Sequence, residues 1–278
     1  MKAKYSIALM VAAVALLALS VPVQASKIDD QIISSAKKSY VFKNYLKNDD
    51  IKIQSKDGAV TLTGTVSEES HKTLARETVA GLSGVKTVDN RLEVKGTPLA
   101  ATNSDAWLVT KVKTTLLFHS SVSASATEVD VKDGIVTLRG DAASQAQKDL
   151  TTEYAKDVDG VKDVKNEMVV SAPSKKTQPS KKTQTAGDKI DDASITGLAK
   201  MTLLYHRSTS ALNTSVTTKN GVVTLTGKAK NAAEKDLATK YVNDVNGVKS
   251  VKNQMTIEEP ESKTKEILFP LPAGRVMQ

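Results

Sequence analysis

The sequence predicts an α+β protein of three tandem modules, each with the order αββαβ and two helices packed on one face of a three-stranded mixed sheet. The first observation is a repeated turn sequence, which reads DGAVTLTG at 57–64, DGIVTLRG at 133–140 and NGVVTLTG at 220–227. The second is a later signature, GVKTVDN, GVKDVKN and GVKSVKN, which begins at Gly84, Gly160 and Gly247. The turn glycines are Gly58, Gly134 and Gly221, so the two signatures lie 26 residues apart in every copy. Such fixed internal spacing indicates homologous repeats.

Each module is expected to begin with a helix that buries one face. Apolar side chains recur every fourth residue, at Ile32, Ala36 and Tyr40, at Leu108, Val112 and Leu116, and at Ile195, Ala199 and Leu203. This period is typical of an amphipathic helix. We expect Val41, Leu117 and Leu204 to widen the buried stripe, and Asp29, Asp105 and Asp192 to be the N-caps.

A hairpin, a second helix and a last strand complete the predicted module. Asp-Gly and Asn-Gly favour a tight turn because both residues tolerate positive φ. Gly64, Gly140 and Gly227 indicate a bend or a close backbone approach in the second strand. The second helix is expected to end at Gly84, Gly160 and Gly247. An alternating segment follows, as at 164–170, and its strand most plausibly lies beside the hairpin, although the sequence does not fix the strand order.

The first 25 residues have the features of a cleavable signal peptide. Lys2 and Lys4 precede a nearly continuous apolar run at 7–19, and the sequence Val-Gln-Ala at 23–25 fits a cleavage site. A retained membrane anchor is the alternative, but the run is shorter than the roughly 20 residues that a membrane span needs. We therefore expect export to the periplasm. Cleavage removes two lysines and no acidic residue, so the net charge of +8 becomes +6.

The repeats divide the remaining chain into modules and linkers. We expect module one at 26–95, a linker at 96–102, module two at 103–172, a lysine- and proline-rich linker at 173–187, module three at 188–259 and a disordered tail at 260–278. The chain has no cysteine, so each module must be stabilised by packing without disulfides. The second linker contains SKKTQ twice and is typical of a solvated, flexible spacer.

Three segments together resemble the BON domain of periplasmic, osmotically inducible proteins. They are the helix Asp105-Ala106-Trp107-Leu108-Val109-Thr110-Lys111-Val112, the hairpin DGIVTLRG and the turn GVKDVKN. All three modules match, although module one has Lys-Lys-Ser-Tyr where leucines are common and module three has Asn220 in place of Asp. The resemblance implies a module that binds rather than catalyses. It also implies an association with anionic phospholipid, envelope maintenance and osmotic stress, and for some members assistance in outer-membrane protein folding.

The residues themselves offer no recognisable catalytic or cofactor chemistry. The three histidines are His71, His119 and His206; the last two are equivalent but lie in different modules, so we expect no metal site and no cofactor. The sequence lacks the G-x-S-x-G, Walker and H-E-x-x-H motifs, and the carboxylates that can be placed fall on exposed faces or helix caps. Basic residues are not interleaved with aromatic ones, which argues against nucleic acid. An enzyme therefore has almost no support.

Trp107 is the most informative single residue for binding. It is the only tryptophan and flanks the buried stripe, with Lys111 one turn away and Lys113 nearby. An aromatic ring beside lysines suits a bilayer interface, so these three residues are the predicted lipid contact. The alternative is a tryptophan that covers the edge of the core or contacts another module.

Two functions remain open at this point. In the first, the protein docks peripherally on anionic phospholipid through module two, and the other modules add avidity across flexible linkers. In the second, it is a chaperone-like or scaffold protein that binds envelope protein clients at sheet edges or at grooves between modules. The oligomeric state, the lipid species and the client are not determined by the sequence.

Overall fold

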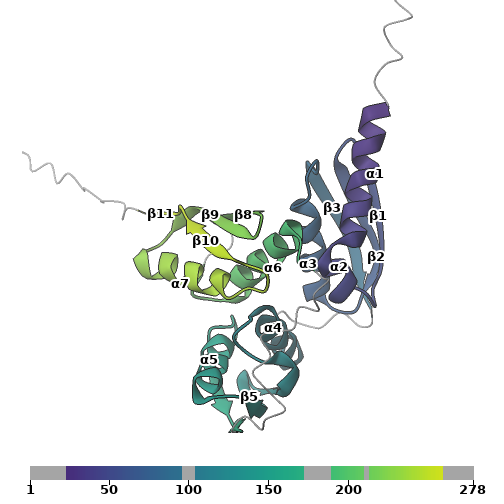
Figure 1. Ribbon diagram of the computed structural model, residues 1–278. Helices are drawn as coiled ribbons and strands as arrows, with labels where there is room; N and C mark the ends of the chain where they lie inside the picture. Colours follow the sequence, from purple (N-terminus) through teal and green to yellow (C-terminus); the bar gives the residue numbers. More distant parts are fainter. Residues whose placement is uncertain (1–22, 96–103, 172–188, 210–212, 259–278) are drawn as a thin grey trace, which may run out of the picture.

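The computed structural model describes residues 23–95, 104–171, 189–209 and 213–258 (Figure 1). Most of the predicted signal peptide, both predicted linkers and the tail lie outside these residues. Module one contains α1 (Val23–Lys38), α2 (Tyr40–Asn44), β1 (Asp50–Lys56), β2 (Ala59–Val66), α3 (Glu69–Ala80) and β3 (Thr87–Val94). Module two contains α4 (Asp105–Phe118), a 3-10 turn (Ala124–Ala126), β4 (Thr127–Lys132), β5 (Ile135–Ala142), α5 (Gln145–Lys156), β6 (Asp163–Asn166) and β7 (Val169–Val170). Module three contains α6 (Asp192–Tyr205), β8 (Thr214–Lys219), β9 (Val222–Ala229), α7 (Ala232–Asn243), β10 (Ser250–Asn253) and β11 (Thr256–Ile257).

The three sheets share one topology, which confirms the predicted fold class. In each sheet the second strand of the hairpin is central, with the first strand antiparallel on one side and the last strand parallel on the other. The last strand therefore lies beside the hairpin, as predicted. In modules two and three it is divided in two, so that β6 and β7 both pair with β5, and β10 and β11 both pair with β9.

The aspartate that recurs in the first helix of each module binds the hairpin turn instead of capping the helix. Asp133 and Gly134 have φ of 55° and 82°, so both are left-handed, as a tight hairpin turn requires. Their N–H groups donate to the carboxylate of Asp105 over 2.7 and 2.9 Å. Asp29 and Asp192 accept the same pair of bonds in the other modules. The predicted N-caps are thus wrong: Ser104 caps α4 and Asp191 caps α6.

Two sets of glycines permit close backbone contacts. Gly140 has a φ of 114°, and a Cβ there would lie 2.0 Å from the carbonyl oxygen of Ala126. Gly64 and Gly227 are equally close to backbone oxygens, as the sequence predicted. The predicted helix ends were too late, because α3, α5 and α7 end four residues before Gly84, Gly160 and Gly247. Those three glycines lie in the turn that leads to the last strand, with φ of 89° to 96°.

The first helices differ from the predicted stripe in two places. Leu117 and Leu204 are 40% and 44% exposed, so they face away from the core and do not widen the buried stripe. In module one the helix is interrupted at Ser39, whose hydroxyl donates to the Ala36 carbonyl and accepts from the Phe42 N–H. The chain then restarts as α2.

The three modules pack against each other. Helix α6 lies against α3 of module one and α4 of module two (Figure 1). The apolar core of module one therefore includes Phe118 of module two and Leu198, Met201, Tyr205 and Val245 of module three. Buried apolar surface therefore joins all three modules. The expectation that they add avidity across flexible linkers stays a prediction, because both linkers lie outside the described residues.

Candidate functional site

The three predicted lipid-contact residues on α4 lie in different environments. The Trp107 ring is half-buried and meets the ring of Tyr205 from module three edge to face, with 6.3 Å between centroids. Lys111 is only 8% exposed, and its ammonium donates to the carbonyl and the carboxylate of Asp159 over 3.0 and 3.2 Å. Lys113 is exposed. The structure therefore places Trp107 at a contact between modules and leaves Lys113 in solvent.

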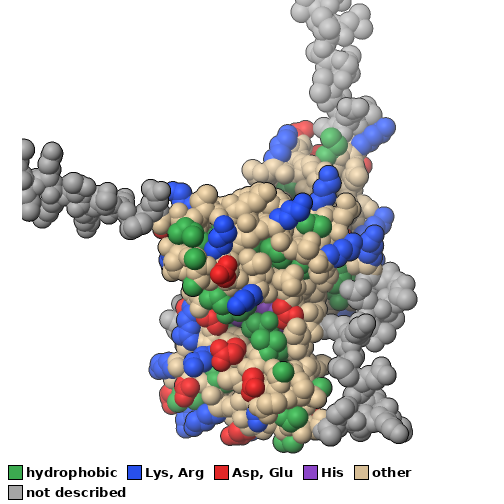
Figure 2. All heavy atoms as spheres, turned by 60° about the vertical axis from the view of Figure 1, so that its left-hand side comes forward, with side chains coloured by type: hydrophobic (Ala, Val, Ile, Leu, Met, Phe, Trp, Pro, Cys, Tyr) green, Lys and Arg blue, Asp and Glu red, His purple; other side chains and the backbone are tan. Residues whose placement is uncertain are grey.

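Lys113 belongs to a mixed basic and apolar surface on α4. Leu117 lies one turn further along the helix and is exposed on the same face. Both residues line a cleft of about 230 Å³ between modules one and two, whose apolar wall includes Tyr45, Leu74 and Phe118. Lysine and arginine side chains are otherwise spread over the visible face of the molecule (Figure 2).

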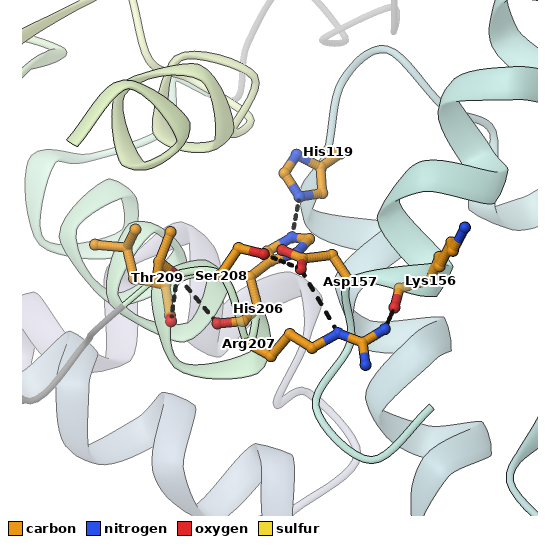
Figure 3. Close-up of polar contacts among 8 residues, drawn as sticks. His119, Lys156, Asp157, His206, Arg207, Ser208 and Thr209 are labelled. Atoms are coloured by element: carbon orange, nitrogen blue, oxygen red, sulfur yellow. Dashed lines mark hydrogen bonds and ion pairs between the residues drawn. The ribbon is translucent and has the colours of Figure 1, made fainter. Parts of the chain in front are cut away.

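The most developed polar cluster lies between modules two and three, at the ends of α4 and α6. His119 and His206 directly follow these helices and are 0% and 1% exposed. Their Nε2 atoms approach to 3.2 Å. The Nδ1 atom of His119 lies 3.3 Å from Asp244, and that of His206 lies 3.1 Å from Asp157. Figure 3 shows the His119–His206 contact and Asp157 together with its partners. The two histidines lie in different modules, and the structure brings them together.

The cluster has approximate two-fold symmetry, and each histidine pairs with the carboxylate of the other module. Each imidazole stacks on a tyrosine of its own module, His119 on Tyr154 at 3.9 Å and His206 on Tyr241 at 4.0 Å between centroids. Every equivalent pair is separated by 87 positions in the chain. The arrangement is therefore that of an isologous dimer interface within one chain.

Backbone hydrogen bonds frame the histidines on both sides. On one side the Ser120 N–H donates to the Asp244 carbonyl, and the Asn246 N–H donates to the Phe118 carbonyl. The equivalent bonds on the other side run from Arg207 to Asp157 and from Asp159 to Tyr205. Two short antiparallel bridges thus fix the rings in place, pairing His119 with Val245 and Val158 with His206.

Both carboxylates of the cluster are held in their charged form. Burial alone would raise the pKa of Asp244, but hydrogen bonds from His119, Ser121, Tyr154 and Ser120 outweigh it and lower the pKa to about 2. Burial likewise opposes ionisation of Asp157, but bonds from His206, Ser208 and Tyr241 prevail and lower its pKa. Burial raises the pKa of Tyr154 and of Tyr241, so both hydroxyls stay protonated as donors. The cluster therefore has two fixed negative charges around two imidazoles.

The described residues contain no group of three or more histidine, cysteine or acidic side chains that could hold a metal ion. Within the same ranges, no helix is both long and apolar enough to cross a bilayer. The third histidine, His71 of module one, lies 2.6 Å from Asp49 and 3.2 Å from Glu68.

The sequence profile of the BON domain matches the chain three times, at residues 28–96, 104–172 and 191–259. These matches cover well over half of the chain, and each spans the αββαβ unit of one module, apart from the first residues of α1. The chain belongs to the BON-domain family. The histidine cluster therefore joins BON modules two and three, and the mixed surface of Lys113 and Leu117 lies on the first helix of BON module two.

Curated relatives match about half of this BON-domain chain. Osmotically-inducible protein Y of Escherichia coli is 32% identical over 143 residues, which are 50% of this chain and 71% of the relative. A 21 kDa hemolysin of Actinobacillus pleuropneumoniae is 28% identical over 142 residues, or 50% of this chain and 73% of the relative. Outer membrane lipoprotein DolP of Haemophilus influenzae is 32% identical over 111 residues, or 40% and 57%. The name of the first of these relatives refers to osmotic induction, and the name of the third refers to the outer membrane.

Sequence reasoning missed the histidine cluster, although it noted that the two histidines are equivalent. The signal was present in the +87 relation of His119, Tyr154 and Asp157 to His206, Tyr241 and Asp244. Module one has Lys43 at the equivalent position and so lacks this histidine. A polar set that recurs in only two of three repeats is a reason to look for contact between those two.

Proposed function

We propose that this protein is a non-enzymatic periplasmic protein that associates peripherally with anionic phospholipid and supports the cell envelope under osmotic stress. Its BON-domain membership and the names of its relatives support the envelope assignment. The proposal includes export through the signal peptide at 1–25, whose pattern was described from the sequence. The observation that carries the membrane contact is the exposed pair Lys113 and Leu117 on one face of α4.

In this proposal the main lipid contact lies at Lys113 and Leu117, further along α4 than Trp107 and Lys111. Lys113 supplies an exposed cation for a lipid phosphate, and Leu117 supplies an apolar side chain that can enter the interface. Trp107 remains part of the proposed contact at its half-exposed edge. Lys111 contributes only if its pairing with Asp159 is released, because its ammonium is already bound.

The proposal is tested by flotation of the mature protein with phosphatidylglycerol vesicles and with phosphatidylcholine vesicles. We expect binding only to the anionic vesicles, and a loss of at least several-fold in Lys113→Glu and in Leu117→Asp. Lys132→Glu is the matched control, because it makes the same charge change at an exposed position on β4 of the same module. Equal binding by Lys113→Glu and Lys132→Glu would refute the role of α4. No flotation of the unaltered protein would refute the lipid proposal altogether.

A second function is favoured by exposed apolar residues on edge strands. Val169 on β7 is 63% exposed and Ile257 on β11 is 48% exposed. Among the residues that the structure describes, each of these strands pairs on one side. Such edges can accept an extended polypeptide by strand addition, as a chaperone-like protein or scaffold for envelope proteins would require. Capture of an unfolded outer-membrane protein without lipid, weakened by Val169→Lys, would favour this function over the first.

A further inference from the structure

The contact of His119 with His206 constrains how many protons the two rings can hold. At 3.2 Å, the two Nε2 atoms must have one hydrogen between them, because two hydrogens would collide and two lone pairs would repel. The Nδ1 atom of His206 donates to the Asp157 carboxylate. The Nδ1 atom of His119 lies 3.3 Å from the Asp244 carboxylate, where a hydrogen is favoured because a lone pair on the ring would be repelled. Three ring protons are needed. Two neutral imidazoles have two, so the docked pair contains one shared extra proton.

We propose that His119 and His206 form a proton-sharing latch that joins modules two and three, and that the latch releases when the pair gains a second extra proton. A fourth ring hydrogen would place two N–H groups head to head between two imidazolium ions. The rings cannot easily rotate to avoid this, since each is stacked on a tyrosine and its residue is held by a backbone bridge. Separation of the modules removes the conflict.

The charged and titratable surroundings support a single shared charge. From α5, Asp157 and Tyr154 face the pair, and from α7, Asp244 and Tyr241 do so. Arg207 lies 3.8 Å from Asp157 on the outer side, and Glu153 acts on Tyr241. The two carboxylates stabilise the first extra proton on the rings. Each carboxylate is already bound by hydroxyl donors, so neither can move to stabilise a second one.

The proton count predicts how docking depends on pH. Two separated histidines with an ordinary pKa of about 6.5 bind one proton between them at pH of about 6.5, two below it and none above it. The docked pair holds one extra proton across this range. Docking is therefore tightest near pH 6.5 and weakens on both sides, because the separated state binds more protons in acid and fewer in base. Between pH 6.5 and 5.0 the docking constant falls by about 8-fold.

Four backbone amides report docking directly, because they donate across the interface: Ser120, Asp159, Arg207 and Asn246. Hydrogen exchange of the full mature chain is measured from pH 5 to 8 and divided by the exchange of amides within the β4–β5 hairpin. We expect relative protection of these four amides to peak near pH 6.5 and to fall about 8-fold by pH 5.0. The fluorescence of Trp107 should shift to the red over the same range, because its ring loses its contact with Tyr205.

Variants and a second measurement make the test decisive. His119→Gln/His206→Gln removes both titrating rings while leaving amides that can bond to each other, so the pH dependence should disappear. His71→Gln is the matched control and should keep the unaltered profile. In the unaltered chain, ring ¹⁵N NMR at pH 7 should show three hydrogens on the two rings, one of them between the two Nε2 atoms. Two neutral rings at that pH, or a pH profile that survives in the double variant, would overturn the latch.

Discussion

Helices α4 and α6 occupy the same place in two copies of one module, yet they meet different surroundings. Helix α6 has Ser194 and Gly197 where α4 has Trp107 and Thr110. These small residues let α3 of module one approach closely, so α6 is buried on nearly every side. On α4 the corresponding outward face keeps Lys113 exposed to solvent. The difference shows that a few outward positions decide whether a repeated helix joins modules or faces a partner, while the inward stripe stays the same.

The contact of α6 with module one combines close packing and hydrogen bonds. The N–H groups of Tyr40 and Val41 donate to the side chains of Asp191 and Ser194 over 2.7 and 3.0 Å. These donors are the first two residues of α2. The interruption at Ser39 thus directs the N–H groups at the start of α2 toward the start of α6.

The largest change in stability is expected at the C-terminal ends of α4 and α6, where each helix is followed by a buried histidine. Asp244→Asn removes the negative charge opposite His119 and should lower the free energy of unfolding at pH 7 by about 2 kcal/mol. The pKa of Asp244 is lowered from 3.8 to about 2, so its charge stabilises the fold fully above pH of about 4 and less as the pH falls toward 2. Urea unfolding at pH 7 and at pH 2.5 measures this. A difference between the proteins that stays constant over this range would contradict the assignment.

A smaller effect is expected where the two helices differ in packing. Gly197→Thr gives α6 the residue of α4, and its Cβ would lie 2.6 Å from the Thr78 hydroxyl oxygen. Overpacking of this kind should destabilise the protein by about 1–2 kcal/mol. Thr110→Ala on α4 is the control and should change stability by less than about 0.5 kcal/mol. Thermal unfolding compares the two, and equal stability would mean that α6 does not pack against α3 as described.

The smallest change in stability is expected at Lys113 and Lys200, which occupy equivalent positions on α4 and α6. The Lys200 ammonium lies 3.0 Å from the Glu77 carboxylate, which is 11% exposed, whereas Lys113 is exposed on α4. Lys200→Ala should cost about 1 kcal/mol, reduced by high salt, and Lys113→Ala should cost less than about 0.5 kcal/mol. Urea titrations at low and high salt measure both. Lys113→Ala should instead weaken vesicle binding, which Lys200→Ala should leave unchanged.

Some predicted residues are important for the fold but bind another part of the backbone than expected. Asp105 was recognised as important at the start of the helix, but its carboxylate binds the N–H groups of Asp133 and Gly134. Both roles satisfy free backbone donors, and the sequence does not distinguish them. Leu117 fitted the apolar period but is exposed, because a period identifies a face only approximately when a helix is apolar on more than one side.

The sequence by itself determined the three repeats, the hairpin turns, the αββαβ order and the close approach at Gly140. The repeats follow from the fixed spacing of the two signatures, and the other features depend on local backbone preferences and on periods of two and about four residues. Only the tertiary structure decided that the core of module one includes side chains of modules two and three, that Trp107 meets Tyr205, and that His119 meets His206. Such contacts join residues 87 to 153 positions apart, and their geometry depends on how whole modules dock. No local pattern encodes that docking, because it depends on the shapes and charges of surfaces that exist only after each module has folded.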